Sequence, residues 1–462
     1  MSAAPAGLVI AGGTVYSPSG PVDADVRVAQ GRIAAIEPRG TDPGGAEVVD
    51  AAGLLVLPGA IDVHVHGRDP GFPEKETFES LTAAAVVGGV TTVFDMPNTV
   101  PGVDGREAFE AKLEAVAARA RTDFGLWGLV RSGSTAGQIA DLASAGAIGL
   151  KAYLGYAWDP GARRMLYGTG GQDLEPPCDY GTLVRLAPAL VQSRLRLGVH
   201  AEDAGVLIAS QRPIDTYADL LASRPAAAEA VAVAALGAVA RTAGLAVHVC
   251  HLASAAGLAA ARAARRSGAT MTLEACPHHL WLSDQDQERL GPRLKGYPLV
   301  RTADDQAALR AGLADGEIQI VATDHAPHTE GEKSAPLAEA APGNPGVQTL
   351  LVSCLELARA GGDLGAAVRW VSWWPAFLFG LAGRKGGIEP GADADLVLVD
   401  PAGETLVGPA TALSRQRHGL LDGRRFGFAV RATYLRGRLV ARDGAPAGDP
   451  AGQLVRPGGE PR

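Results

Sequence analysis

The sequence predicts an α/β fold: a (β/α)8 TIM-like barrel with a small β-sandwich domain built from both ends of the chain. Three observations support this prediction. The 462 residues exceed the usual size of one domain, so one large domain plus a smaller one is expected. Both chain ends carry short strand-like segments separated by glycine-rich turns. The middle alternates short apolar runs with longer amphipathic segments of helical length.

The strand-like segments at the two chain ends have tight turns between them. Near the N-terminus we expect strands at Gly7–Ile10, Ala24–Val28, Arg32–Ile36 and Glu47–Asp50. Near the C-terminus we expect them at Asp395–Val399, Ala429–Leu435 and Arg438–Arg442. Two β-rich segments at opposite ends of a chain can pair into one sheet. We therefore assign residues 1–57 and 383–462 to the small β-rich domain, and residues 58–382 to the barrel.

The middle of the chain contains eight apolar runs that are typical of buried strands. They are Ala60–His64, Thr91–Met96, Gly125–Leu129, Ala147–Tyr153, Leu195–His200, Ala246–Cys250, Thr270–Glu274 and Gln319–Ala322. Amphipathic stretches lie between most of them, at Phe78–Val87, Arg106–Ala120, Ala226–Ala243 and Ala256–Ser267. Strands that alternate with helices are parallel, and eight such units in roughly 300 residues favour a closed barrel. An open, doubly wound sheet is the alternative topology.

Composition and charge exclude several classes of protein. Apolar residues make up 47% of the chain, which favours a globular protein over a disordered one. The net charge of −8, without a basic run, indicates neither nucleic acid nor an anionic membrane as a partner. The N-terminus lacks a signal-peptide pattern, and no apolar stretch suggests a membrane span. The four cysteines have no paired spacing, so we expect reduced, buried thiols in a cytoplasmic protein.

Polar residues stand where several of the predicted barrel strands end. The first strand ends in Asp62-Val63-His64-Val65-His66. Residues two apart on a strand point to the same face, so His64 and His66 lie together. Further strands end at Lys151, His200, His251 and Asp324. The carboxyl ends of the strands form the active-site mouth of such barrels, so these six side chains should converge there. His248 lies further inside its strand, and we expect it to support the site rather than bind a ligand.

These residue types suit a site with two metal ions. Neutral imidazole is a good zinc ligand, and a carboxylate both binds metal and moves protons. A lysine is out of place among cations unless its amine has reacted with carbon dioxide to give a carbamate that bridges two metals. Two metals can hold one hydroxide and polarise a scissile carbonyl. Asp324 would then accept the hydroxide proton and deliver it to the leaving amide nitrogen.

With this set of residues the sequence resembles the amidohydrolase superfamily, and within it the cyclic amidases: dihydroorotase, allantoinase and hydantoinase. The resemblance covers essentially the whole chain, from Leu57-Pro58-Gly59 to the Pro390–Leu396 segment. It implies that the histidine pair and the aspartate bind one metal, the two later histidines bind the other, and a carboxylated lysine bridges both. It thus implies the ligand set His64, His66, Lys151, His200, His251 and Asp324.

One motif after the second histidine resembles the dihydroorotase signature, His66-Gly67-Arg68-Asp69-Pro70-Gly71. In that enzyme the arginine holds the substrate carboxylate, whereas allantoinases and hydantoinases generally lack it. A planar guanidinium matches a carboxylate with two hydrogen bonds. A surface ion pair of Arg68 with Glu74 or Glu76 is the structural alternative. The Met96–Thr99 and Asp324–His328 motifs also resemble dihydroorotase and imply substrate contacts for Asn98 and His328.

Other motifs depart from dihydroorotase and resemble allantoinase. The usual Asn-Pro-Pro-Leu-Arg run is replaced by Gly296–Arg301, which contains Tyr297 but no asparagine. Gln348 stands where dihydroorotases commonly have glutamate. The connection at 155–180 is unusually long and without clear structure, as active-site lids often are. It contains Trp158, Arg163, Arg164 and Tyr167, for which pocket-lining and simple solvent exposure are both plausible.

The leading interpretation is a metal-dependent hydrolase of a cyclic ureide, with dihydroorotase (dihydroorotate and water to N-carbamoyl-aspartate, reversibly) as the first hypothesis. The alternative is allantoinase, hydantoinase or another cyclic amidase that works by the same mechanism. A non-catalytic scaffold of the same fold is a third hypothesis, which the intact ligand set disfavours. We expect two divalent metals, zinc first, a carbamate on Lys151, a small-molecule substrate and a homo-oligomer, either a dimer or a tetramer.

Overall fold

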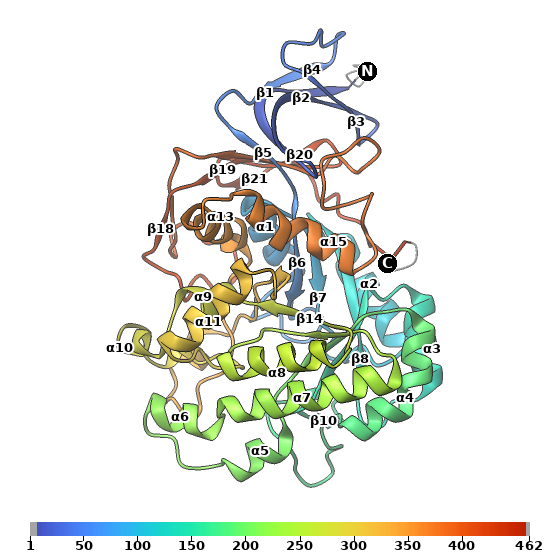
Figure 1. Cartoon of the computed structure of the whole chain (residues 1–462), viewed down its shortest axis with the longest axis vertical. Helices are drawn as coiled ribbons and strands as arrows, with labels where there is room; N and C mark the ends of the chain where they lie inside the picture. Colours follow the sequence, from blue (N-terminus) through green and yellow to red (C-terminus); the bar gives the residue numbers. More distant parts are fainter. Residues whose placement is uncertain (1–6, 459–462) are drawn as a thin grey trace.

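The structure is a computed structural model that describes residues 7–458. A barrel surrounded by helices forms one part, and a sheet built from both ends of the chain lies on one side of it (Figure 1). Blue N-terminal strands and orange-red C-terminal strands meet in that sheet. The prediction about a leader sequence and the outermost parts of the predicted β-rich domain fall on residues 1–6 and 459–462, which lie outside the described residues.

The barrel consists of parallel strands whose order in space follows their order in the chain. They are β6 (Ala60–Val65), β7 (Val90–Asp95), β8 (Asp123–Val130), β9 (Gly149–Tyr153), β12 (Leu197–His200), β13 (Val247–Val249), β14 (Met271–Ala275) and β15 (Ile320–Val321). The segment after β15 closes the ring, because the His66 amide donates to the His325 carbonyl at 2.7 Å. The predicted barrel is therefore confirmed, and the open-sheet alternative is wrong.

Helices follow most of the barrel strands and cover the outside of the barrel. The longer ones are α1 (Phe78–Val87), α2 (Arg106–Ala117), α3 (Ala136–Ala145), α4 (Tyr180–Ser193), α7 (Ala226–Ala243), α8 (Ala255–Arg266), α11 (Ala303–Ala314) and α13 (Leu350–Ala360). Shorter ones are α5 (Ala204–Ala209), α6 (Tyr217–Ser223), α9 (Pro277–Trp281), α10 (Gln287–Leu290), α12 (Glu330–Ser334), α14 (Gly365–Val368) and α15 (Trp374–Leu378). Helix α1 begins where Thr77 and Ser80 form a reciprocal capping box. Helices α1 and α7 have the predicted bounds.

One stretch, Tyr217–Ala243, is long and apolar enough to cross a membrane by composition, contrary to the expectation from sequence. It comprises α6 and α7. Buried residues recur along α7, from Ala228 to Ala240, and include Leu236. Arg241 and Glu229 also lie on this helix. Because α7 packs between α4 and α8 on the barrel, its apolar character comes from its place in the core.

A large indole fills the barrel interior below the mouth. Trp127 on β8 is fully buried, and its Nε1 donates to the Val63 carbonyl at 3.0 Å. Gly149 on β9 and Gly198 on β12 leave room for it, since a Cβ at these positions would lie 2.5 and 2.9 Å from the indole. The Phe379 ring meets Trp127 edge-on, with 5.3 Å between the ring centroids. The interior below the mouth is thus a packed core rather than a pore.

The second sheet combines strands from both chain ends, as predicted. Its members are β1 (Leu8–Ser17), β2 (Gly20–Ala29), β3 (Arg32–Pro38), β4 (Glu47–Asp50), β5 (Leu55–Pro58), β16 (Leu396–Asp400), β19 (Ala429–Leu435), β20 (Arg438–Arg442) and β21 (Ala445–Pro446). A separate pair is formed by β17 (Thr405–Leu406) and β18 (Arg425–Phe426). Strand β5, which the sequence pattern did not reveal, joins the halves because it pairs with both β1 and β16. The predicted fold class is confirmed.

The long connection after β9 differs from its prediction as a structureless loop. It contains a hairpin of β10 (Ala157–Asp159) and β11 (Arg164–Leu166). Trp158 also pairs with Glu175, whose carboxylate binds Arg131 at 2.5 Å. Backbone pairing and this ion pair give the segment a defined path beside the mouth. A hairpin of three-residue strands has too little periodicity to be recognised from sequence.

Candidate active site

The six side chains predicted as metal ligands lie together at the mouth of the barrel. They are His64, His66, Lys151, His200, His251 and Asp324. All are buried except Asp324, whose side chain is 15% exposed. His251 and Asp324 have φ values of 37° and 48°, in the left-handed region that side chains other than glycine seldom adopt. Such strain concentrates at functional sites, where surrounding contacts hold a side chain in one direction.

Three of these side chains form a first group around one point. The Nε2 atoms of His66 and His64 lie 2.9 and 3.4 Å from Oδ1 of Asp324. Burial alone would raise the pKa of Asp324, but His64 and His66 hold it well below its usual range. Asp324 is therefore ionised at neutral pH. Two imidazole nitrogens and a carboxylate oxygen that converge in this way fit a divalent cation.

His200 and His251 form a second group. Nδ1 of His200 faces Nε2 of His251 at 3.0 Å. Two imidazole nitrogens on one tetrahedral zinc lie about 3.3 Å apart, given Zn–N bonds of about 2.0–2.1 Å. Burial lowers the pKa of both histidines, so both are neutral, which is the form that binds metal. The rings of His64 and His251 are 5.1 Å apart, so the two groups are neighbours.

Lys151 lies in the same cluster, without the partners that a buried ammonium needs. Its side chain is fully buried, and among the described residues its Nζ has no hydrogen-bond partner. A lone buried cation is costly, and lysine is the least suitable neighbour for bound metals. An amine converted to a carbamate would be an anion with two ligand oxygens. The orphaned Nζ and the four imidazoles thus fit a pair of divalent cations.

Glu274 is a buried carboxylate behind His64 that was not predicted as a site residue. It accepts from Nδ1 of His64 at 2.5 Å and lies 2.9 Å from Nε2 of His248. Burial would raise the pKa of Glu274, but the two histidines hold it well below its usual range. Burial and Lys151 lower the pKa of His64, yet Glu274 and Asp324 outweigh them and raise it to about 10. Metal binding at His64 would therefore release a proton. His248 occupies the supporting position expected for it.

Two more side chains orient ligand histidines. Oδ1 of Asn98 lies 2.7 Å from Nδ1 of His66. Glu202 lies 2.8 Å from Nε2 of His200 and forms an ion pair with Arg224. Such partners fix the tautomer and direction of a ligand histidine. The signal for Glu202 was the His200-Ala201-Glu202 spacing. Glu274 became recognisable only in the closed barrel, where β14 comes close to β6 with β15 between them.

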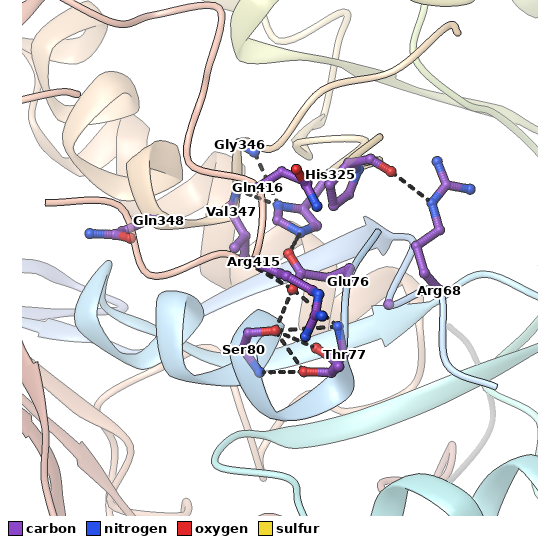
Figure 2. A network of polar contacts seen from close by, with 12 residues as sticks. Arg68, Glu76, Thr77, Ser80, His325, Gly346, Val347, Gln348, Arg415 and Gln416 are labelled. Atoms are coloured by element: carbon purple, nitrogen blue, oxygen red, sulfur yellow. Dashed lines mark hydrogen bonds and ion pairs between the residues drawn. The ribbon is translucent and has the colours of Figure 1, made fainter. Parts of the chain in front are cut away.

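Arg68 and His328, predicted to contact substrate, are neighbours at the rim of the mouth. Arg68 is buried with φ 58°, and its Nε donates to the Pro327 carbonyl at 3.2 Å. Its Nη2 lies 3.2 Å from Nε2 of His328. Figure 2 shows that its guanidinium points away from Glu76. No ion pair links Arg68 to Glu74 or Glu76 among the described residues, so the surface ion-pair alternative is wrong.

Glu76 instead belongs to a network that holds the segment after β15 (Figure 2). One carboxylate oxygen lies 3.2 Å from Nε2 of His325, and the other accepts from the Arg415 amide at 3.1 Å. Nδ1 of His325 accepts from the Gly346 amide at 3.1 Å. Because His325 directly follows Asp324, this network fixes the direction of the Asp324 carboxylate.

Aromatic side chains line the mouth above His200. The Tyr156 ring lies 4.6 Å from the His200 ring and stacks on Tyr153 at 5.5 Å. Tyr167, which is 48% exposed, reaches across the mouth to Tyr297, with their rings 6.4 Å apart. These contacts place Tyr167 and Tyr297 at the mouth.

The other residues singled out in the connection after β9 lie further from the ligands. Trp158 is buried beside Arg131, Arg163 pairs with Asp104 at 2.9 Å, and Arg164 lies 3.7 Å from Asp159.

Gln348 lies away from the mouth. Its amide nitrogen donates to the Thr411 carbonyl at 2.8 Å, and its oxygen accepts from the Leu413 amide at 2.9 Å. It lines a cavity of about 530 Å³ between the barrel and residues 404–422. Figure 2 shows it on the far side of His325 from Arg68. Gln348, which distinguishes this sequence from dihydroorotases, thus contacts Thr411 and Leu413 rather than the candidate ligands.

Two family models match this chain, each over a different segment. The Amidohydrolase family model matches residues 195–440, and a model described as Dihydro-orotase-like matches residues 53–151. An allantoinase of Rubrobacter xylanophilus is 37% identical over 459 residues, covering 97% of each chain. A dihydroorotase of Pelotomaculum thermopropionicum is 34% identical over 443 residues, covering 94% of this chain and 99% of that one.

The fold is similarly close to a solved structure. The L-hydantoinase (dihydropyrimidinase) of Arthrobacter aurescens superposes with a TM-score of 0.89 at 28% identity, covering 97% of this chain and 99% of that one. The family models and the whole-length relatives point to one family, and the structural match agrees with the barrel fold. This chain therefore belongs to the amidohydrolase family, within its cyclic amidase branch.

Proposed function

We propose that this protein hydrolyses a ring amide of a cyclic ureide at the barrel mouth. The observation that carries the proposal is that four histidines, Asp324 and a buried lysine amine without a partner in residues 7–458 lie in two neighbouring groups at the mouth. This donor set suits two divalent cations, and zinc is the first candidate for imidazole and carboxylate ligands. A carbamate on Lys151 would supply the bridge between them.

The roles of the side chains follow from their positions. Two divalent cations in this cluster would supply an acidified water and a Lewis acid for the scissile carbonyl. Asp324 is ionised, partly exposed and held by His325, so it accepts the proton of the attacking water and passes it to the departing ring nitrogen. Glu274, Asn98 and Glu202 keep their histidines in the ligand orientation.

Allantoin is the first candidate substrate. The relative named allantoinase has the higher identity of the two reported above, 37% against 34%, and both span nearly the whole chain. Allantoin is an uncharged ring, and the tyrosines at the mouth offer it apolar faces together with hydroxyl donors.

Dihydroorotate is the second candidate, and a specific observation favours it. The Arg68 guanidinium is buried at the rim, beside the neutral His328, with donors left beyond its bond to Pro327. Burial and Arg68 lower the pKa of His328 to about 3, so the pair carries one positive charge at neutral pH. A buried guanidinium attracts an anion, and the carboxylate of dihydroorotate is one.

Ring opening by purified, metal-analysed protein should be measured with allantoin, dihydroorotate, hydantoin and dihydrouracil side by side. If dihydroorotate is the substrate, Arg68→Ala lowers its kcat/KM by about 10- to 100-fold, because a charged hydrogen bond contributes about 1.5–3 kcal/mol. Turnover of allantoin that Arg68→Ala leaves unchanged would favour allantoin. Arg262→Ala on the outer helix α8 is the matched control, and no turnover of any ring would overturn the proposal.

Two further parts of the proposal concern the setting of the enzyme. We propose a homo-oligomer, dimer or tetramer, which light scattering of the metal-loaded protein would test.

We also propose that it acts in the cytoplasm. All four cysteines, Cys178, Cys250, Cys276 and Cys354, are free and buried, as expected for a reducing compartment.

A further inference from the structure

Tyr153 has a buried hydroxyl without a hydrogen-bond partner. The residue is 3% exposed, and within residues 7–458 no donor or acceptor contacts its Oη. Buried hydroxyls are nearly always paired, because an unpaired one forfeits its bonds to water. Tyr217 illustrates the usual case: it is 4% exposed, and its Oη donates to the Val300 carbonyl at 2.9 Å. The hydroxyl of Tyr153 therefore needs a partner that the chain itself does not supply.

The ring of Tyr153 lies among the candidate metal ligands. Tyr153 is the last residue of β9 and lies two residues after Lys151, so both side chains project from the same face of the strand. Nζ of Lys151 lies 5.2 Å from the centroid of the Tyr153 ring. The ring is stacked on Tyr156 at an interplanar angle of 20° and lies 6.2 Å from the His200 ring. The stacking on Tyr156 holds the Tyr153 ring in place beside Lys151 and His200.

The charged side chains that act on Tyr153 belong to the mouth of the barrel. Asp324 and Arg68 are among the charged groups that act on its phenol. The phenol thus lies within electrostatic reach of both the candidate general base and the rim arginine. A ring substrate held between Asp324 and Arg68 would meet it.

We propose that the Tyr153 hydroxyl donates a hydrogen bond to an oxygen of the bound ring substrate and so determines which rings are accepted. The proposal rests on the proposed function, because a cyclic ureide brings carbonyl oxygens to the mouth. A phenol is protonated at neutral pH and has one proton to donate. Within residues 7–458 this donor has no partner, and the substrate oxygen would supply one. A ring without an oxygen at this point would leave the donor unpaired and bind less well.

The test uses Tyr153→Phe and, as a matched control, Tyr217→Phe in the metal-loaded full-length enzyme. Tyr153→Phe should leave the metal content unchanged and leave the melting temperature the same or higher, because it removes an unpaired polar group. It should lower kcat/KM on the ring that is turned over by about tenfold, the value of one hydrogen bond. Tyr217→Phe should lower the melting temperature and leave kcat/KM unchanged.

The outcomes separate this proposal from the proposed function. An active parent enzyme with unchanged kcat/KM in Tyr153→Phe overturns the role of Tyr153 alone. A melting temperature that falls as in Tyr217→Phe also overturns it, because the hydroxyl would then have a partner in the free enzyme. A parent that opens none of the rings overturns the proposed function, and this proposal with it. A loss confined to kcat would place the hydrogen bond on the attacked carbonyl, and a rise in KM alone on another oxygen; both support the proposal.

Discussion

Two buried clusters of charged side chains lie at opposite ends of the barrel strands, and only one of them is complete without a ligand. At the base, where β8 begins, Nζ of Lys385 binds carboxylate oxygens of Asp123, Asp395 and Asp393 at 2.5, 2.6 and 3.1 Å. Arg436 also pairs with Asp123. At the mouth, Nζ of Lys151 has no hydrogen-bond partner within the described residues.

The difference between the two lysines separates a cluster that stabilises the fold from one that is suited to bind metal. Burial would lower the pKa of Lys385, but its three carboxylates outweigh this and raise it well above the ordinary value. The base cluster joins β8 to the segment before β16, so it stabilises the contact between the barrel and the end sheet. Its carboxylates could geometrically hold a metal, yet Lys385 already occupies their centre. At the mouth, by contrast, Lys151 forms no hydrogen bond with the ligand side chains that the structure describes.

The largest effect should come from removing the mouth lysine. We expect Lys151→Ala to lose most of its bound metal and to lower kcat by about a thousandfold or more, because metal assistance contributes several kcal/mol. Metal analysis and ring-opening kinetics on the same preparation measure both. Full activity with full metal content in Lys151→Ala would contradict the two-metal proposal. Lys151 would then not be needed to bind metal, and the two clusters would not differ in this respect.

Removing the base lysine should instead affect stability. Lys385→Met leaves three buried carboxylates short of a cation, which costs about 3–5 kcal/mol of unfolding free energy. Metal content and kcat per folded molecule should stay the same, and Lys385→Arg should recover part of the stability. Denaturant titration with metal analysis checks this. Loss of metal in a folded Lys385→Met protein would show that the two clusters are coupled.

A buried carboxylate outside both clusters gives a pH test. Glu229 on α7 accepts from the Ala253 amide at 2.8 Å, and burial raises its pKa to about 7. Between its ordinary value of about 4.3 and 7, the folded protein keeps a proton that the unfolded chain has released, so stability falls as pH rises. The stability gain of Glu229→Gln over the parent should therefore grow by about 2–3 kcal/mol from pH 5 to pH 8. A gain that is equal at both pH values would contradict this assignment.

The smallest expected effect concerns support of the ligands at the mouth. Glu274→Gln should weaken metal binding by about 10- to 100-fold, because His64 loses the carboxylate that orients it. Chelator competition gives the affinity directly. Glu229→Gln is the matched control, since Glu229 is equally buried but bonds Ala253 and Ser254 rather than a ligand histidine. Equal affinities in the two variants would mean that Glu274 serves packing alone.

Much of the fold was predictable because its signals are local. Apolar runs bounded by turns gave the barrel strands, and amphipathic stretches gave helices such as α1 and α7 with the observed bounds. The candidate ligands were recognisable for the same reason: each stands at the end of such a run, and parallel strands bring their carboxyl ends together. The hairpin at 157–166 was missed, because its strands are too short to show a period.

The sequence by itself determined the barrel, the origin of the second sheet at both chain ends and the six residues that meet at the mouth. Only the tertiary structure decided which of them have partners. Glu274 meets His64 across 210 positions, Lys385 meets Asp123 across 262, and Gln348 bonds Thr411 away from the mouth. The physical reason is that periodicity along a strand reports which face is buried. Which charges and donors face each other depends on strands that become neighbours only when the barrel closes.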